Sequence, residues 1–251
     1  LRYTIDSNSI SEFAINARIT HVYRHAKYIV MKLSNSYCLV IHIGMSGSLS
    51  LNSIDDNSDQ TRVPKKHDHI DLILTQNQKK YLLIYNDPRR FGNFFITNQK
   101  DLLIHHLFKN LGVEPLSNKF NFIYFKEKIF LKNTPIKKLI MDNHIVVGVG
   151  NIYASEALFK AKISPLRVAK TLSDSEITLL LKTIKETLLV AIAKGGSTLR
   201  DYKNINGASG NFQNEHLVYQ RSSLACYVCS DIILNIVIGQ RNSFYCPSCQ
   251  S

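Results

Sequence analysis

The sequence predicts a multidomain α+β protein: an N-terminal antiparallel β-sandwich, then a helical domain, then a β-hairpin that carries cysteines. Three observations predict this order. Residues 1–100 contain short segments rich in β-branched and aromatic residues, with turn residues between them. Segments between 101 and 220 place apolar residues at helical spacing. Residues 221–251 contain four cysteines in the pattern C-x2-C-x16-C-x2-C. We therefore expect domains at 1–100, 101–220 and 221–251.

Short β-prone segments fill the first domain, and their close spacing favours a sandwich or a barrel. The expected strands are 18–23, 28–33, 37–43, 48–51, 70–75, 81–86 and 93–97. Residues 53–59 are polar and are expected to form a loop.

Five helices are expected to follow, at 101–111, 117–130, 134–142, 151–162 and 173–195. Thr134 and Pro135 predict an N-cap followed by proline at the first helical position. Ser173 and Glu176 have the spacing of a capping box, and Gly195 is a typical C-terminal stop.

Charge is the next constraint on function. The chain has 31 lysines and arginines against 19 acidic residues, a net charge of +12. This balance favours a polyanionic partner, with nucleic acid ahead of an anionic membrane. Many basic proteins bind neither, so charge alone leaves that alternative open. No apolar run approaches the ~20 residues of a membrane-spanning helix, and no signal peptide is visible, so we expect a cytoplasmic protein.

The four cysteines predict one structural Zn²⁺ site. Their spacing is typical of a tetrahedral site in which each C-x2-C pair forms a knuckle, and four thiolates leave no position for water. The ligands are Cys226, Cys229, Cys246 and Cys249. Two disulfides are the alternative, which the unpaired Cys38 and the missing signal peptide disfavour. Residues 232–238 and 244–245 are expected to form a hairpin whose turn, 239–243, has Arg241 at its tip.

A glycine-containing turn, MDNHIVVGVGNIYASE at 141–156, joins the third and fourth expected helices. Gly148 and Gly150 can adopt positive φ and allow another backbone to approach closely. The unpaired N–H groups at the start of the next helix attract anions, and Asn151 adds an amide there, which suits a DNA phosphate. A helical hairpin that needs glycine only to turn is the alternative.

This segment resembles the helix–two-turn–helix signature of the formamidopyrimidine-DNA glycosylase and endonuclease VIII superfamily. The sequence GQRNSFYCPSCQ at 239–250 is similar to the zinc finger of that family. Two further motifs, HIGMSGSL at 42–49 and DPRRFG at 87–92, favour the formamidopyrimidine-DNA glycosylase branch. The four motifs agree in order over the whole chain.

The resemblance implies a bifunctional DNA glycosylase and AP lyase that removes oxidised purines such as 8-oxoguanine and formamidopyrimidines and cleaves the strand by β,δ-elimination. Its partner would be double-stranded DNA with oxidised bases or abasic sites, bound by a monomer. Met45, Arg89 and Phe91 would fill the space that a flipped-out base leaves, which offsets the lost stacking. Considered singly, each could instead be a core or surface residue.

The resemblance implies further roles near the DNA backbone. Lys27 would contact a phosphate and donate a proton in β-elimination, although a lysine there could simply be a solvated strand end. Arg241 would bind the phosphates that flank the lesion and act in δ-elimination. His67 and Lys132 match DNA-contacting positions. His67 and His69 could instead form a metal pair, but no carboxylate cluster accompanies them.

The nucleophile of the family is an N-terminal proline followed by glutamate. This sequence begins Leu1-Arg2-Tyr3, about thirty residues into the family pattern. We expect the first strand and first helix of that pattern to be absent, and little glycosylase activity from residues 1–251 alone. A non-catalytic zinc-containing DNA-binding module is the alternative function, and a zinc-ribbon protein that binds RNA is a third. A lesion-capping loop is expected at 202–213.

Overall fold

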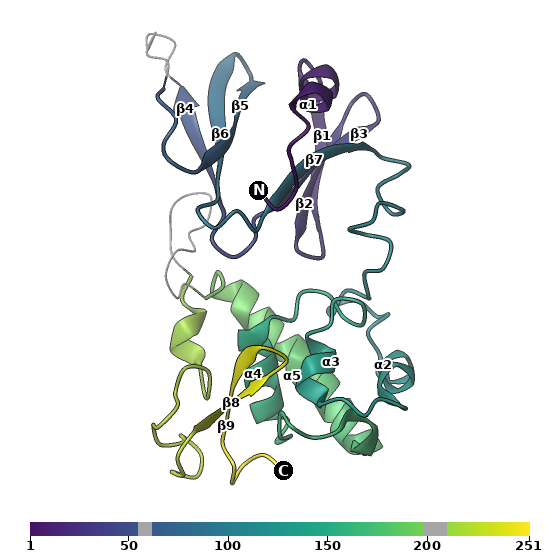
Figure 1. The fold of residues 1–251 in the computed structure, drawn as a ribbon, viewed down its shortest axis with the longest axis vertical. Coiled ribbons are helices and arrows are strands. Elements are labelled where there is room, and N and C mark those ends of the chain that lie inside the picture. The colour runs from purple at the N-terminus through teal and green to yellow at the C-terminus, as the bar shows by residue number, and fades with distance from the viewer. Residues whose placement is uncertain (55–61, 198–209) are drawn as a thin grey trace. The chain divides into compact units, whose positions relative to one another are not determined.

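The structure is a computed structural model that describes residues 1–54, 62–197 and 210–251. The chain divides into two units, one formed mainly by Leu1–Phe108 and the other by Lys109–Gly196 with Phe212–Ser251 (Figure 1). Each unit has its own core. Among the described residues, none of the helices combines the length and the apolar character that crossing a bilayer requires.

The first unit is an antiparallel β-sandwich, as predicted. One sheet has the order β1-β2-β3-β7 and the other has the order β4-β6-β5. The strands are β1 (Ile19–His25), β2 (Tyr28–Leu33), β3 (Tyr37–His42), β4 (Ser48–Ile54), β5 (Asp68–Gln76), β6 (Lys79–Asn86) and β7 (Asn93–Asn98). Met31 and Ile41 of the first sheet and Leu83 and Tyr85 of the second are buried in one core, so the two sheets pack face to face.

The expectation of strands alone before residue 101 is wrong in one place. Helix α1 (Ser7–Ala14) packs against β3 and β7 and buries Ile10. Asp6 is its N-cap, and the carboxylate accepts a 3.1 Å hydrogen bond from the Ser9 N–H. The expected loop at 53–59 lies largely outside the described residues.

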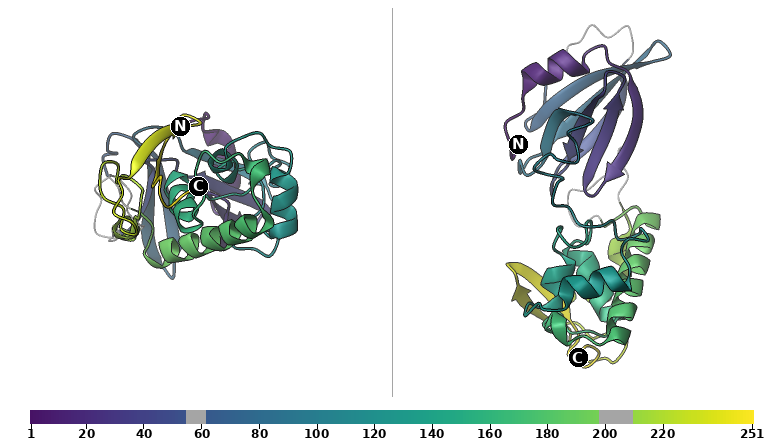
Figure 2. Two further views of the ribbon diagram at one scale, coloured as in Figure 1. Left: turned by 90° about the horizontal axis from the view of Figure 1, so that it is seen from below. Right: turned by 90° about the vertical axis from the view of Figure 1, so that its right-hand side faces the viewer.

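The second unit is helical, with a short hairpin at its end. Its helices are α2 (Phe122–Ile129), α3 (Ile136–Ile140), α4 (Asn151–Lys160) and α5 (Asp174–Ala193), and Figure 2 shows α5 as the longest of them. Short 3-10 turns occur at Ala169–Thr171 and Phe212–Glu215. The predicted capping box is present: Ser173 caps α5, and the Glu176 carboxylate accepts from the Ser173 N–H at 2.7 Å.

Two helix predictions need correction. Residues 101–111 form successive turns instead of a helix. Aromatic packing explains this, because His105 stacks on Phe95 at 4.5 Å and Phe108 packs on Tyr28 at 4.7 Å. The third helix begins at Ile136, so Pro135 is its N-cap and not its first helical residue.

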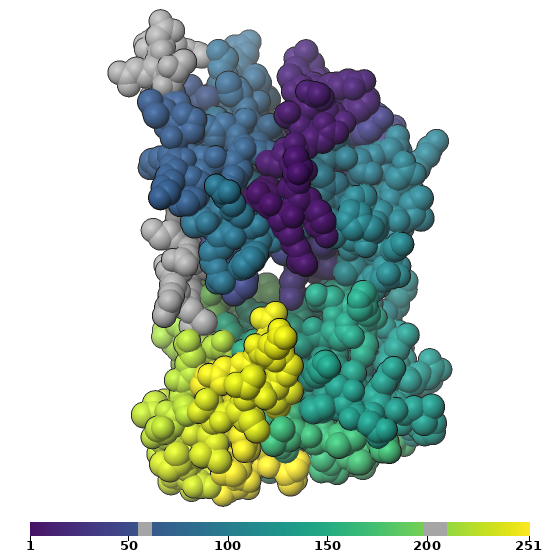
Figure 3. Space-filling model, in the orientation of Figure 1, coloured from purple at the N-terminus to yellow at the C-terminus, as the bar shows by residue number. Residues whose placement is uncertain are grey.

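The hairpin consists of β8 (Leu234–Ile238) and β9 (Arg241–Tyr245). Its turn is only Gly239–Gln240, both with positive φ, which is the geometry of a tight two-residue turn. The predicted five-residue turn was too long: Arg241 opens β9 and pairs with Ile238. Figure 3 shows this hairpin, in yellow, at the surface of its unit.

Candidate functional site

Two turns of the first unit lie backbone to backbone. In the turn after β3, the Gly47 N–H donates to the Ile43 carbonyl at 2.9 Å. A Cβ on Gly44 would lie 2.8 Å from the backbone nitrogen of Gly92, which belongs to the turn before β7. A Cβ on Gly92 would lie only 1.7 Å from the Tyr85 hydroxyl oxygen. The two turns can approach this closely only because both positions are glycine.

These turns present Met45, Arg89 and Phe91 to solvent. Met45 is 64% exposed and Phe91 is 45% exposed. The Arg89 guanidinium lies 5.0 Å from the centre of the Phe91 ring, within the range of a cation–π contact. The structure therefore brings the predicted Arg89 and Phe91 together and presents them, with Met45, on adjoining turns.

Lys27 lies in the two-residue turn between β1 and β2, directly before the first residue of β2. Ala26 has φ of 53°, and its carbonyl accepts from Arg24 Nη1 at 2.9 Å, which fixes the turn. Burial lowers the pKa of His42, and the Lys27 charge lowers it further. The lysine charge is therefore near the His42 end of β3, where the Met45 turn begins.

His67 is half-buried and has φ of 76°. Its carbonyl accepts from the Asp87 N–H at 3.1 Å, so it lies beside the turn that carries Arg89. The imidazole of His69 contacts the Asp87 carbonyl at 2.9 Å. In the part of the chain that the structure describes, the metal-ligand cluster found is the cysteine set and not a His67–His69 pair.

In the second unit, the glycine turn leads into the N-terminus of α4. Gly148 has φ of 84°, and Gly150 is the N-cap of α4, with no side-chain cap hydrogen bond. A Cβ at either glycine would meet no atom within 4 Å, so both face open space. Val147 donates to the Val113 carbonyl at 3.0 Å and holds the turn in place. The first N–H groups of α4 are thus placed to bind an anion.

Asn151 joins α4 to the hairpin. Its Nδ2 donates to the Asn242 carbonyl at 2.9 Å, and its Oδ1 is buried without a partner among the described residues. Beside it, the Lys137 amine donates to Ser243 Oγ at 2.7 Å. Burial, together with the charge of Arg241, lowers the pKa of Lys137 to about 7. Lys137 was not predicted from the sequence, which does not distinguish it from the exposed Lys138.

The two remaining predicted cations lie on separate segments of this unit. Arg241 is exposed at the start of β9. Lys132 is exposed in the loop after α2, where its N–H donates to the Ile129 carbonyl at 3.0 Å.

The four predicted cysteines converge. Their sulfur atoms all lie within 4.8 Å of one another, with Cys226 to Cys249 at 3.9 Å and Cys229 to Cys246 at 3.4 Å. A tetrahedron with Zn–S bonds of about 2.3 Å has edges of about 3.8 Å, so the residues fit one Zn²⁺. All are unbridged thiols, which excludes the disulfide alternative in this structure. With all four positions filled by protein, the ion is structural.

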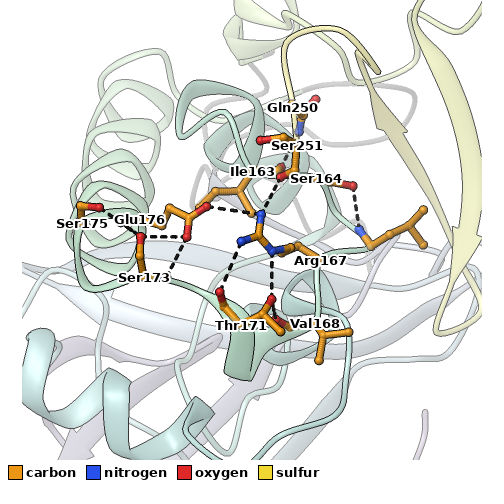
Figure 4. Close-up of polar contacts among 11 residues, drawn as sticks. Ile163, Ser164, Arg167, Val168, Thr171, Ser173, Ser175, Glu176, Gln250 and Ser251 are labelled. Atoms are coloured by element: carbon orange, nitrogen blue, oxygen red, sulfur yellow. Dashed lines mark hydrogen bonds and ion pairs between the residues drawn. The ribbon is translucent and has the colours of Figure 1, made fainter.

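Polar contacts fasten the cysteine segment to the helices. Gln250 is buried; its Nε2 donates to the Ile163 carbonyl at 2.8 Å, and its Oε1 accepts from the Cys246 N–H at 3.0 Å. Figure 4 shows Arg167 at the centre of a second group, where it contacts the Ser251 carbonyl at 3.4 Å and Glu176 at 3.5 Å. The C-terminal end of the cysteine segment is thereby tied, through Arg167, to the start of α5.

A buried carboxylate anchors the segment before the zinc site. Glu156 of α4 is fully buried and accepts from the N–H groups of Leu217, Val218 and Tyr219 at 2.8, 3.0 and 2.9 Å. Burial raises the pKa of this carboxyl, and the three donors act against that effect. The sequence prediction missed its role, although a glutamate within an otherwise buried helix face was a signal.

Family models match three parts of the chain. The formamidopyrimidine-DNA glycosylase N-terminal domain matches residues 1–94, the H2TH domain of that family matches 111–203, and a zinc finger found in FPG and IleRS matches 223–251. The expected lesion-capping loop at 202–213 lies mostly outside the described residues.

Individual relatives agree over most of the chain. Formamidopyrimidine-DNA glycosylase of Rickettsia bellii (strain OSU 85-389) is 42% identical over 250 residues, covering 100% of this chain and 88% of the relative. That of Haemophilus influenzae (strain 86-028NP) is 44% identical over 235 residues, covering 94% and 82%.

Solved structures show the same similarity. The MutM (Fpg) protein of Thermus thermophilus matches with a TM-score of 0.83 and 35% identity, over 98% of this chain and 86% of that one. Lactococcus lactis Fpg in complex with DNA containing an abasic site matches with a TM-score of 0.85 and 32% identity, over 97% and 86%. On this evidence, the chain belongs to the formamidopyrimidine-DNA glycosylase family.

Proposed function

We propose that this protein is a base-excision repair glycosylase with AP lyase activity. It removes oxidised purines, 8-oxoguanine and formamidopyrimidines, from double-stranded DNA and cleaves the strand by β,δ-elimination. The observation that carries the proposal is the exposed group of Met45, Arg89 and Phe91 on two interlocked turns. Among the relatives, L. lactis Fpg was solved with DNA containing Fapy-dG, and MutM with DNA containing carbocyclic 8-oxo-G.

The exposed group suits a duplex from which one nucleotide has been extruded. Extrusion costs a few kcal/mol of stacking and pairing, and inserted side chains recover part of that cost. Phe91 offers a flat apolar face, Met45 an adaptable one, and Arg89 hydrogen-bond donors for the unpaired base. Because the Arg89 guanidinium lies over the Phe91 ring, the hydrogen-bond donors of Arg89 and the ring of Phe91 would enter the duplex together.

The phosphates would be bound by groups in both units. In the second unit these groups are Arg241, Lys132, and the N-terminus of α4 at Gly150 and Asn151. Zinc would act here only by fixing the hairpin that presents Arg241. In the first unit, Lys27 and His67 would contact the DNA backbone, with Lys27 also donating a proton during elimination.

A covalent trap tests the enzymatic step. In this family an N-terminal proline amine attacks C1′ of the damaged nucleotide, and borohydride reduces the resulting iminium to a stable adduct. We expect an adduct on DNA with 8-oxoguanine opposite cytosine when residues 1–251 follow an added segment that begins with proline and glutamate. We expect none from residues 1–251 alone. No adduct from the longer chain, with DNA binding intact, would favour the non-catalytic DNA-binding module instead.

Arg89→Ala tests the recognition step. Binding to a duplex with an abasic site should weaken far more than binding to an undamaged duplex, because only the former lets Arg89 reach an unpaired base. An equal loss on both duplexes would assign Arg89 to the backbone and leave base recognition unexplained.

We also propose a cytoplasmic location. A zinc site of four thiolates needs a reducing compartment, and the substrate, DNA, is found there in bacteria such as those of the relatives.

A further inference from the structure

The first unit contains a buried carboxylate that the proposed reaction does not use. Asp87 directly follows β6, is completely buried and contacts two turns at once. Its Oδ1 accepts from Ser46 Oγ at 2.8 Å, and its Oδ2 accepts from the Gly92 N–H at 2.7 Å. Ser46 Oγ in turn accepts from the Arg89 N–H at 3.2 Å. One side chain thus links the turn that bears Met45 to the turn that bears Arg89 and Phe91.

The backbone of Asp87 connects these turns to a third segment, which contains His67. Its N–H donates to the His67 carbonyl at 3.1 Å, and its own carbonyl accepts from the Arg90 N–H at 3.2 Å. The second of these bonds closes a β-turn with proline at its second position, a residue that pre-sets the required φ. Asp87 is therefore the residue at which the segments of Met45, His67 and Arg89 meet.

Isolated burial of a carboxylate is unfavourable, so a completely buried aspartate needs hydrogen bonds. Here, among the described residues, the side-chain bonds come from Ser46 and Gly92 of the two turns and not from a cation. The arrangement holds the tips of the turns while leaving their side chains exposed, which is the requirement for groups that must enter a DNA stack in one geometry.

We infer that Asp87 is a positioning residue that sets the geometry of Met45, Arg89 and Phe91 for insertion at the lesion. The inference rests on the proposed function. Asp87 touches neither DNA nor the reacting atoms in this role. Its loss should therefore weaken the discrimination between damaged and undamaged DNA and have much less effect on general affinity for the duplex.

The test compares two dissociation constants for each variant of residues 1–251. One duplex carries a tetrahydrofuran abasic analogue opposite cytosine, and the other is undamaged. The affinity ratio is the affinity for the abasic duplex divided by the affinity for the undamaged one. Asp87→Ala should lower this ratio by about tenfold or more, since small misplacements of binding groups have effects of that size. The affinity ratio of Asp87→Asn should lie between those of the unaltered chain and Asp87→Ala. Its amide oxygen can still accept from the Gly92 N–H, while its NH2 group faces Ser46. Ser46→Ala should lower the ratio, and should add little to Asp87→Ala.

Leu33→Ala is the matched control for a simple loss of stability. Leu33 is buried in the same sandwich, at the end of β2 that lies away from the His42 end of β3 and the turn after it. The control should lower the melting temperature of the unit without changing the affinity ratio. If Asp87→Ala and Leu33→Ala leave the same ratio while the unaltered chain still prefers the abasic duplex, the inference is overturned and the proposed function stands.

Amide hydrogen exchange supplies a readout that does not depend on DNA. Residues 44–47 and 89–92 should exchange faster in Asp87→Ala than in Leu33→Ala at matched stability. Equal exchange in the two variants would also overturn the inference, even for a chain that showed no preference for damaged DNA.

Discussion

Replacing Lys137 by methionine tests whether the folded protein lowers the pKa of the Lys137 amine, which contacts the hairpin at Ser243. Methionine is similar in length and has no charge. The Lys137 side chain is 1% exposed and donates to Ser243 Oγ at 2.7 Å. Its pKa in the folded chain is about 7, against an ordinary value of 10.5.

The sign of the pH dependence follows from these two values. Between pH 7 and 10.5 the unfolded chain binds a proton on Lys137 that the folded chain does not bind. The free energy of unfolding therefore rises with pH in this window, by at most about 1.4 kcal/mol per pH unit, and this contribution is flat below pH 7. Between pH 7.5 and 9 the native protein should gain about 2 kcal/mol relative to Lys137→Met.

The assay is chemical denaturation of the zinc-loaded protein, followed by far-ultraviolet circular dichroism. Helices α2 to α5 belong to the second unit and α1 is the short helix of the first, so the helical signal reports mainly on the unit of Lys137. Lys138→Met is the control, because Lys138 is on the same helix but exposed. Parallel stability curves for the native protein and Lys137→Met over this pH range would refute the reasoning.

Three further predictions follow from the same contacts. Glu156→Gln should destabilise the second unit by about 2–4 kcal/mol in denaturant titrations, because one amide oxygen cannot replace a carboxylate that accepts three N–H bonds; a loss under about 1 kcal/mol would contradict this. Removing Zn²⁺ with a chelator should abolish the amide protection of β8 and β9 and weaken binding to abasic-site DNA, whereas unchanged protection would show that the metal is dispensable. Gly148→Ala should cost only about 1 kcal/mol, for its positive φ, but Gly92→Ala should cost at least about 3 kcal/mol, since its Cβ would overlap the Tyr85 hydroxyl; thermal melts of equal midpoint would disprove the distinction.

Local signals in the sequence were sufficient for much of the fold. The Ser173–Glu176 capping box, the β-prone segments and the cysteine spacing each act over a few residues, so their geometry is encoded where they occur. Residues 101–111 have apolar spacing like that of a helix, yet the aromatic contacts of His105 and Phe108 decide their conformation. These contacts join residues 101–111 to β7 and, through Phe108, to the distant strand β2, and the spacing of apolar residues within 101–111 does not record them. Helix α1 was missed because its local signal is the N-cap residue Asp6, and a search for apolar residues at helical spacing does not detect a cap.

The candidate site divides in the same way. Several of the predicted DNA-contacting residues are exposed side chains, among them Met45, Arg89, Phe91, Lys132 and Arg241. The residues that hold them, Asp87, Lys137 and Glu156, are buried by partners from distant segments. A sequence gives the identity of a charged residue but not its burial, so these supporting roles became visible only in the folded chain.

The contact between Gly44 and Gly92 also limits how such a protein can vary. Because the two main chains touch, neither turn can be lengthened, rotated or given a side chain at its glycine without displacing the other. Within these two turns, variation is therefore expected at the side chains of the tips, such as Met45 or Phe91, over an unchanged backbone. In these two turns, substitutions at the tips leave the contact intact, whereas an insertion or deletion in either turn would separate the two glycines.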